Sequence, residues 1–265
     1  MQVGISTASL FQRKHTEEAL EFLSQNKVPC AEVFLESYCE YTKEYGEVLK
    51  KVKGDIPVHS VHVLTTQFEP QLYSLNDRAQ NDSFKLLEEA MTVAEKINAK
   101  YYTFHGGAFF KKTPVKIDYE RVGRITQEII DVCDKHGVSL AYENVHWGYY
   151  NHVGFFEQVR KRTRGLKATL DIKQARQSGF SYKDYIDEMA GDIVTVHLSD
   201  VMENGSMCLP SKKGTTDFYD IFSRLNDKGF NGALILEVYK NDYSEYKELF
   251  NSLEYVSEIA EKALK

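Results

Sequence analysis

The chain has 265 residues, with 33 Lys and Arg against 39 Asp and Glu, so its formal net charge is −6. This acidic balance argues against general affinity for nucleic acids or anionic membranes, because both are negatively charged. No run reaches the roughly 18 apolar residues of a membrane span, and we expect a soluble, cytoplasmic protein with a core of its own. The four cysteines lack metal-type spacing and are expected to be buried, reduced thiols: Cys30, Cys39, Cys133 and Cys208.

Segments typical of strands and of helices alternate along the whole chain. The strand-like segments are short and rich in β-branched and aromatic residues. In chain order they are Gln2–Thr7, Ala31–Glu36, Pro57–Leu64, Lys100–His105, Val138–Glu143, Ala168–Asp171, Ile193–His197 and Ala233–Glu237. Between them, apolar residues recur three and four positions apart, which indicates about eight helices that pack on a core.

The joints between helices and strands repeat one pattern, in which a basic residue is followed by Asn or Gly and then by a strand. The pattern occurs around Asn98, Gly137 and Gly229, and it is typical of a helix that ends in a left-handed residue. Eight successive βα units in about 250 residues predict an α/β fold, a single (β/α)₈ TIM barrel over residues 1–265. The alternative is an open doubly wound sheet, but residues 4–7 do not form its usual glycine-rich turn.

Six predicted strands end on a residue that can bind a metal or transfer a proton. These residues are His62, His105, Glu143, Asp171, His197 and Glu237. The residues two positions earlier lie on the same strand face and are mostly small or hydroxylic, which suits a crowded barrel interior. We therefore expect the six side chains to converge at the C-terminal mouth, where barrel enzymes have their active sites.

Three of the six are carboxylates, and burying them together is costly unless a cation compensates their charge. A set of three oxygen donors and one nitrogen donor suits Mn²⁺, Mg²⁺, Co²⁺ or Zn²⁺. The predicted metal ligands are Glu143, Asp171, His197 and Glu237. His62 and His105 could hold a second metal with Glu143 as the bridge, or they could bind substrate hydroxyls.

The order of these motifs resembles the xylose isomerase-like barrel superfamily over nearly the whole chain. The matching motifs are Val-His62, Phe-His105-Gly-Gly, Tyr-Glu143-Asn, Leu-Asp171-Ile, Val-His197-Leu-Ser-Asp and Leu-Glu237-Val. That group includes sugar phosphate isomerases and epimerases, D-tagatose 3-epimerase-like and inosose dehydratase-like enzymes, and the endonuclease IV family. In its ketose epimerases one metal is held by Glu, Asp, His and Glu, which match the same four residues here.

The resemblance to endonuclease IV is weaker. The first two zinc ions of that branch also use histidines that match His62 and His105. Both branches usually carry a His three residues after the aspartate, where this chain has Gln174. The loop at 208–214 lacks the Asp-x-His needed for a third zinc, and the epimerase Arg six residues after the metal-binding His is replaced by Glu203.

The resemblance implies metal-dependent isomerisation or epimerisation of a small keto sugar, sugar phosphate or polyol. One of Glu143 and Glu237 removes a proton and the other returns it, through an enediolate. The alternatives are a metal-dependent phosphodiesterase on abasic DNA, a dehydratase acting at the same site, and a catalytically silent sugar-binding barrel. A homo-oligomer is left open, because oligomers are common in this fold family.

Three residues near the predicted mouth are candidate substrate contacts. Glu36 ends the second strand on the mouth side, and Gln174 takes the position of the missing His. Trp147 is the only tryptophan, and it either stacks on the apolar face of a sugar or packs within its loop.

Overall fold

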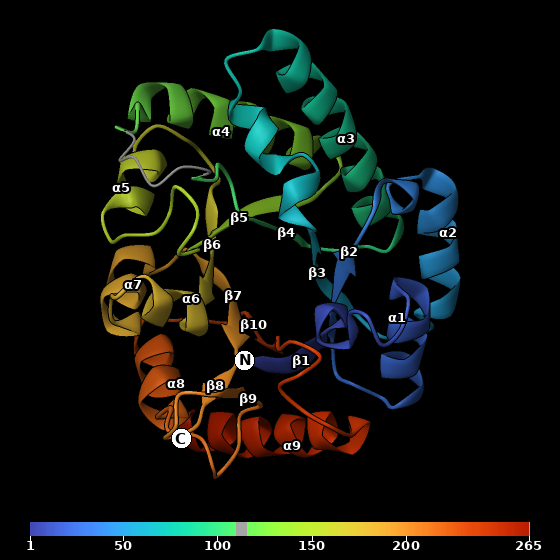
Figure 1. Ribbon diagram of the computed structural model, residues 1–265, viewed down its shortest axis with the longest axis vertical. Coiled ribbons are helices and arrows are strands. Elements are labelled where there is room, and N and C mark those ends of the chain that lie inside the picture. Colours follow the sequence, from blue (N-terminus) through green and yellow to red (C-terminus); the bar gives the residue numbers. More distant parts are fainter. Residues whose placement is uncertain (110–115, 265) are drawn as a thin grey trace.

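The structure, a computed structural model, describes residues 1–109 and 116–264. Parallel strands close into a barrel that is surrounded by helices (Figure 1), so the predicted TIM barrel is confirmed and the open sheet is excluded. The order around the barrel is β1-β10-β7-β6-β5-β4-β3-β2. Its strands are β1 (Gln2–Ser6), β2 (Ala31–Leu35), β3 (Val58–Val63), β4 (Tyr101–Phe104), β5 (Ser139–Glu143), β6 (Lys167–Asp171), β7 (Ile193–Leu198) and β10 (Ala233–Leu236).

The helices lie outside the barrel because each has one apolar face to bury against the strands. They are α1 (Thr16–Gln25), α2 (Lys43–Val52), α3 (Asp77–Lys96), α4 (Tyr119–Lys135), α5 (Phe155–Arg160), α6 (Ile172–Gln177), α7 (Tyr182–Met189), α8 (Phe218–Asp227) and α9 (Tyr246–Ala263). Four short 3₁₀ helices join them: η1 (Thr7–Leu10), η2 (Tyr38–Glu40), η3 (Thr65–Gln67) and η4 (Glu69–Tyr73). None of the helices in this described part of the chain is both long and apolar enough to cross a membrane.

Strict alternation of one strand with one helix, as predicted, is wrong in two places. Two helices, α6 and α7, separate β6 from β7 because Asp171 caps α6 directly at the strand end and Gly179, with φ +79°, stops it after two turns. A small hairpin, β8 (Asp200–Val201) with β9 (Met207–Cys208), follows β7.

The predicted helix-to-strand joints are confirmed. Asn98, Gly137 and Gly229 all have positive φ, at +55°, +69° and +76°. This left-handed residue turns the chain back toward the barrel and lets the next strand begin within a few residues. The expectation of buried cysteines holds for Cys30 and Cys133, but it is wrong for Cys39, which is exposed, and for Cys208, which is only half-buried.

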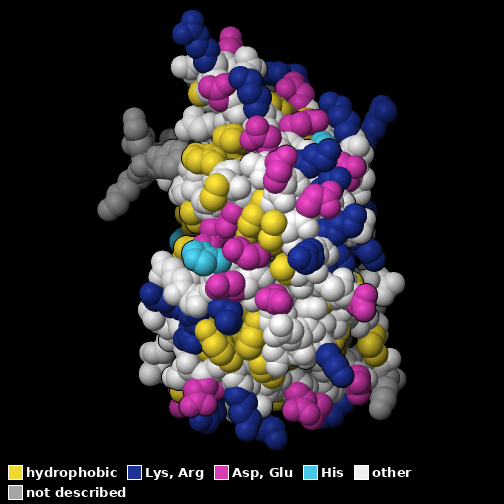
Figure 2. All heavy atoms as spheres, turned by 90° about the vertical axis from the view of Figure 1, so that its right-hand side faces the viewer, with side chains coloured by type: hydrophobic (Ala, Val, Ile, Leu, Met, Phe, Trp, Pro, Cys, Tyr) yellow, Lys and Arg dark blue, Asp and Glu magenta, His cyan; other side chains and the backbone are white. Residues whose placement is uncertain are grey.

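Strand register places the polar residues of the sequence at one end of the barrel. Asp171 lies beside His197, and His197 lies beside Ile235, two residues before Glu237. The residues predicted to fill the interior below the mouth are all fully buried: Ser60, Thr103, Ala141, Thr169, Thr195 and Ile235. On the outside, basic and acidic side chains are interspersed over the face shown in Figure 2.

Candidate functional site

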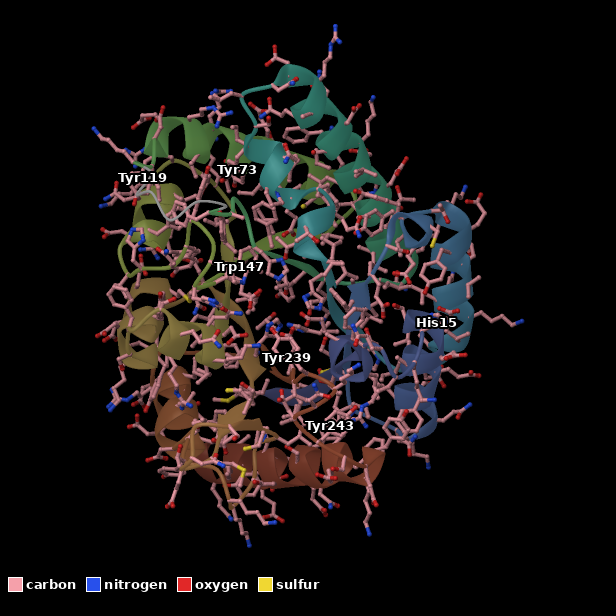
Figure 3. The ribbon with its side chains drawn as sticks, viewed as in Figure 1. His15, Tyr73, Tyr119, Trp147, Tyr239 and Tyr243 are labelled. Carbon is pink, nitrogen blue, oxygen red and sulfur yellow. The ribbon has the colours of Figure 1, made fainter. Side chains whose placement is uncertain are left out.

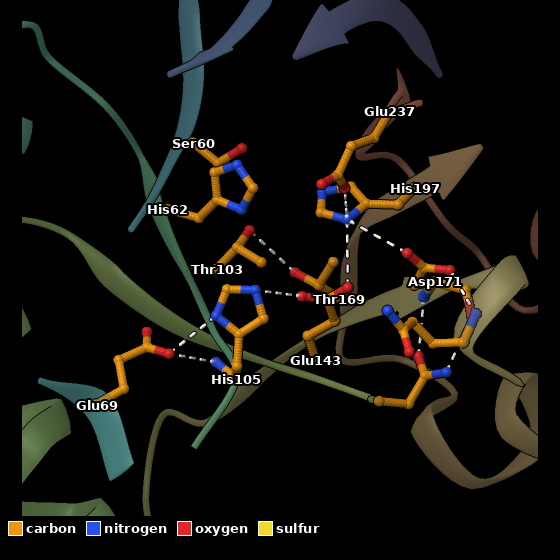
Figure 4. A network of polar contacts seen from close by, with 12 residues as sticks. Ser60, His62, Glu69, Thr103, His105, Glu143, Thr169, Asp171, His197 and Glu237 are labelled. Atoms are coloured by element: carbon orange, nitrogen blue, oxygen red, sulfur yellow. Dashed lines mark hydrogen bonds and ion pairs between the residues drawn. The ribbon is translucent and has the colours of Figure 1, made fainter. Parts of the chain in front are cut away.

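Four side chains from consecutive strands around the barrel meet at its C-terminal mouth, and together they form the four-residue site. Glu143 ends β5, Asp171 ends β6, His197 is the fifth residue of β7, and Glu237 directly follows β10. One donor atom of each lies within 4.8 Å of the other three (Figure 4). The structure thus brings together the four residues that the sequence analysis selected as metal ligands.

The donor atoms of the four-residue site face one another without hydrogen bonds. Nδ1 of His197 lies 2.5 Å from Oε2 of Glu237 and 3.4 Å from Oε1 of Glu143. Nδ1 of His197, Oε2 of Glu143 and Oε2 of Glu237 are buried and have no hydrogen-bond partner among the described residues. Buried polar atoms normally have such partners. Three carboxylates and one imidazole arranged in this way fit a divalent cation, which would use the lone pairs of all four.

Burial and mutual charge displace the pKa values at the four-residue site in opposite directions. Burial raises the pKa of Asp171 to about 7, with Lys173 opposing the rise and Glu143 adding to it. Burial would also raise the pKa of Glu237, but the adjacent His197 lowers it to about 2. Burial would lower the pKa of His197, yet Glu237 and Glu32 hold it well above its usual value. Without a cation, protons on His197 and Asp171 therefore compensate much of the negative charge.

The far side of the His197 ring contacts Glu32, which lies within β2. Nε2 of His197 donates to Oε2 of Glu32 at 3.1 Å and lies 3.0 Å from its Oε1. The hydroxyls of Ser60 and Thr103 also donate to Oε2, at 2.7 and 3.0 Å. Glu32 is 0% exposed, and although burial would raise its pKa, His197 and His62 hold it well below the usual value.

The sequence analysis missed Glu32. The available signal was a single charge inside the otherwise apolar segment Ala31–Leu35. Two of the hydroxyls that were assigned only to filling the barrel interior are the hydrogen-bond donors of this carboxylate.

His105 connects the four-residue site to a second buried carboxylate, Glu69 of η4. Its Nδ1 donates to Oε2 of Glu69 at 2.8 Å, and its Nε2 lies 3.2 Å from Oε2 of Glu143. The hydroxyl of Tyr102 donates to the other oxygen of Glu69 at 2.6 Å. Burial opposes protonation of His105, but Glu69 and Glu143 outweigh it and raise the pKa to about 9. No sequence pattern pointed to Glu69, because it belongs to an irregular segment between β3 and α3.

His62 lies beside the four-residue site without being one of its members. The residue is only 2% exposed, and neither ring nitrogen has a hydrogen-bond partner among the residues described. The ring packs 4.6 Å from that of Phe34, and its centroid is 5.8 Å from the ring of His105. Nε2 of His62 faces Oε1 of Glu32 at 3.8 Å, which is too far for a hydrogen bond, so the ring keeps donor and acceptor capacity for a molecule in the cavity that it lines.

A cavity of about 180 Å³ opens onto these residues. Trp147 and Tyr239 line it and lie near the centre of the view in Figure 3, and the Trp147 ring is 5.8 Å from that of His105. The lining combines aromatic and aliphatic side chains with a few polar groups, among them Phe11, Phe34, Leu64, Trp147, Tyr239, His62, His105, Lys173 and Gln174. This composition is typical of a site for a small polar molecule that also has apolar faces.

The candidate substrate contacts differ in position. Gln174 lines the cavity, and its Oε1 accepts from the backbone N–H and from Nδ1 of His146, at 3.1 and 2.6 Å. Glu36 is not among the residues that line this cavity in the described part of the chain. Its backbone N–H donates to the Glu40 carboxylate, and burial together with Glu40 raises the pKa of Glu36 to about 7.

Lys173 is a further lining residue that the sequence analysis did not select. It is only 8% exposed, and its Nζ lies 4.4 Å from the centroid of the Tyr239 ring. Burial would lower its pKa, but Asp171 and Glu237 raise it, so the side chain is a cation.

A model of the family described as "xylose isomerase-like TIM barrel" matches residues 20–260. The chain belongs to this family. A search of curated proteins finds no significant match. Among solved structures, a D-tagatose 3-epimerase-like protein aligns with a TM-score of 0.79 at 16% identity, over 99% of this chain and 98% of its own.

Two further solved structures align over nearly the full length. D-Psicose 3-epimerase with D-tagatose from Clostridium cellulolyticum H10 has a TM-score of 0.79 at 17% identity and is covered completely on both sides. The IolI protein with a bound zinc atom has a TM-score of 0.73 at 16% identity, over 99% of this chain and 96% of that one. At these identities the likeness concerns the fold.

Proposed function

We propose that the protein is a divalent-metal-dependent isomerase or epimerase that acts on a small keto sugar, sugar phosphate or keto-polyol by proton transfer. The observation that carries the proposal is the four-residue site itself, in which two glutamates share one cation-type cluster at the edge of a small, aromatic-lined cavity. Membership of the xylose isomerase-like family and the similarity to the epimerase structures support this assignment.

The residues that would hold the cation are Glu143, Asp171, His197 and Glu237. When bound, a divalent cation supplies a Lewis acid that stabilises negative charge on substrate oxygens. Mn²⁺, Mg²⁺, Co²⁺ and Zn²⁺ all suit this donor set, and the zinc in the IolI structure is consistent with it.

The proposed proton carriers are Glu143 and Glu237. They come from β5 and β10, which are separated in the barrel by β6 and β7, so their carboxylates reach the cavity from two directions. One carboxylate removes the proton next to the substrate carbonyl and the other returns it, on the opposite face for an epimer or at the neighbouring carbon for an isomer. His105, with Nε2 3.2 Å from Oε2 of Glu143, holds that carboxylate in place.

The cavity favours a small carbohydrate as the substrate. Its volume of about 180 Å³ suits a molecule the size of a monosaccharide. Trp147 offers a flat face to the C–H side of a sugar ring or chain, while His62 and Gln174 offer hydrogen bonds to its hydroxyls. We therefore assign His62 to substrate hydroxyls in preference to a second metal, while both ring nitrogens of His105 face carboxylates, Glu69 and Glu143.

The phosphodiesterase alternative has less support. Within the residues that the structure describes, His62 and His105 do not belong to the metal-type cluster, and Gln174 replaces the histidine of the endonuclease branch. Dehydration of a keto-polyol would use the same residues, so only the identity of the product distinguishes it from isomerisation.

The test is a panel of ketoses, their phosphates, keto-inositols and an abasic oligonucleotide, incubated in D₂O with each of the four metals. We expect solvent deuterium to enter one or more carbohydrates at the carbon beside the carbonyl. Glu237→Gln should slow this exchange by roughly 10²–10⁴-fold, as is usual for loss of a general base. Glu36→Gln is the matched control outside the cavity and should retain exchange. Cleavage of the oligonucleotide without exchange into any sugar would overturn the proposal.

A further inference from the structure

We propose that Glu32 is the positioning residue of the metal site, which orients His197 and selects the ring tautomer that presents Nδ1 to the cation. The inference rests on the proposed function in that it takes the four-residue site to bind a metal. It adds a residue that neither touches the cavity nor belongs to the four donors.

The two nitrogens of His197 have different environments. Nδ1 faces the carboxylates of Glu237 and Glu143 and has no aligned hydrogen bond among the described residues. Nε2 points the other way and donates to Glu32. A neutral imidazole has one protonated and one unprotonated nitrogen, and the partner of the first determines which nitrogen is free to bind a metal. With a carboxylate fixed at Nε2, the free nitrogen is Nδ1.

Glu32 is held so that it can accept but not reorient. Ser60 from β3 and Thr103 from β4 both donate to Oε2, while Oε1 has no aligned hydrogen bond and lies 3.0 Å from Nε2 of His197. The carboxylate thus ties together three strands and the ring of the metal ligand on β7. Glu32 is fully buried below the mouth, and among the four metal-type residues its contact is with His197; its other histidine neighbour is His62, whose Nε2 lies 3.8 Å from Oε1.

A hydrogen bond from His197 to a carboxylate such as Glu32 affects how the histidine binds a metal. A metal-binding histidine usually donates its second N–H to a carboxylate or carbonyl, which fixes the ring and makes the free nitrogen a stronger donor. Loss of such a partner typically weakens metal affinity by 10- to 100-fold. The Glu32 contact has the same arrangement, with the negative charge buried where water screens it little.

The first measurement uses the wild-type protein and needs no variant. In the zinc-loaded protein, ¹H–¹⁵N spectra of the histidine rings should show His197 with a proton on Nε2 and the metal on Nδ1. A proton on Nδ1 with zinc on Nε2 would overturn the inference directly.

The second measurement compares metal affinities by competition with a chelator. In Glu32→Gln, the hydroxyls of Ser60 and Thr103 keep the amide oxygen at the position of Oε2, and the amide NH₂ replaces Oε1, which lies 3.0 Å from Nε2 of His197. The variant loses the negative charge and places an N–H donor beside the N–H of His197, so it disfavours the tautomer that leaves Nδ1 free for the metal. We expect zinc and cobalt to bind 10- to 100-fold more weakly than to wild type.

Glu40→Gln is the matched control. Glu40 is also a buried glutamate, but its carboxylate accepts hydrogen bonds from the backbone N–H groups of Glu36 and Ser37, away from the four-residue site. Its affinity for zinc should change by less than roughly threefold, even where its thermal stability falls as far as that of Glu32→Gln. Equal affinity of wild type and Glu32→Gln, or equal loss in both variants, would refute a positioning role for Glu32. Either result leaves the proposed sugar chemistry to be judged by deuterium exchange.

Discussion

Cation binding at the four-residue site should depend steeply on pH, and the structure determines how the steepness changes. A cation must displace the Nδ1 proton of His197, whose pKa lies well above its usual value, and the proton of Asp171, whose pKa is about 7. Because protons and the cation compete for the same atoms, affinity should rise with pH. Glu237, with a pKa of about 2, is ionised throughout and contributes nothing to this competition.

The size of the change in cation affinity with pH follows from these protonation states. At pH 6 Asp171 is about nine-tenths protonated and at pH 8 only about one-tenth, so Asp171 should release nearly one proton more on cation binding at pH 6 than at pH 8. The Asp171 proton alone should therefore make affinity rise roughly 5-fold between pH 6 and 7 but only roughly 2-fold between pH 7 and 8, and displacement of the His197 proton adds to the rise.

Titration calorimetry in two buffers of different ionisation enthalpy measures the released protons directly. In Asp171→Asn the extra proton that Asp171 releases at pH 6 should disappear. In Lys173→Met the pH range in which cation affinity rises most steeply should move above pH 7, because Lys173 lowers the pKa of Asp171. Proton release that is the same at pH 6 and pH 8 in wild type would show that the assigned competition is incorrect.

Two further predictions concern the surroundings of the site. The folded-state pKa of His105, about 9, is above its unfolded value of about 6.5, so its interactions stabilise the fold below pH 6.5 and this stability is lost as pH rises through 9. Glu69→Gln should lower the pKa of His105 in NMR titrations and weaken the pH dependence of the free energy of unfolding between pH 6.5 and 9. An unchanged His105 titration would contradict the inferred interaction between Glu69 and His105. Gly106→Ala should destabilise by about 1–3 kcal/mol more than Gly137→Ala in chemical denaturation, since both have positive φ but only the former puts a methyl group 1.8 Å from the Tyr142 hydroxyl. An equal loss of stability in the two variants would mean that the loop around Gly106 relaxes to accommodate the methyl group.

The convergence of the metal-type residues was predictable because a closed parallel barrel brings every strand's carboxyl end to the same mouth. Knowing that Glu143, Asp171, His197 and Glu237 end successive strands was therefore enough to expect them close together. The left-handed joints at Asn98 and Gly137 were predictable for an equally local reason, since the backbone geometry of a helix end depends on a few neighbouring residues.

The residues that surround the four-residue site could not be predicted from the sequence in this way. Glu69 lies on a 3₁₀ segment whose path over the mouth follows no periodic rule, and its pairing with His105 spans 36 residues of sequence. Lys173 is the second residue of α6, and only the packing of that helix turns its side chain into the cavity instead of the solvent.

The sequence by itself determined the barrel, the end of it at which the candidate site lies, and the four residues that meet there. These properties follow from short-range periodicity and from the closure of the sheet. Only the tertiary structure decided which nitrogen of His197 faces the carboxylates of Glu143 and Glu237, because the carboxylate on the other side of the ring, Glu32, is 165 residues away in the sequence. A buried charge is stable only where partners from several strands surround it, and such partners become neighbours only when the barrel has closed.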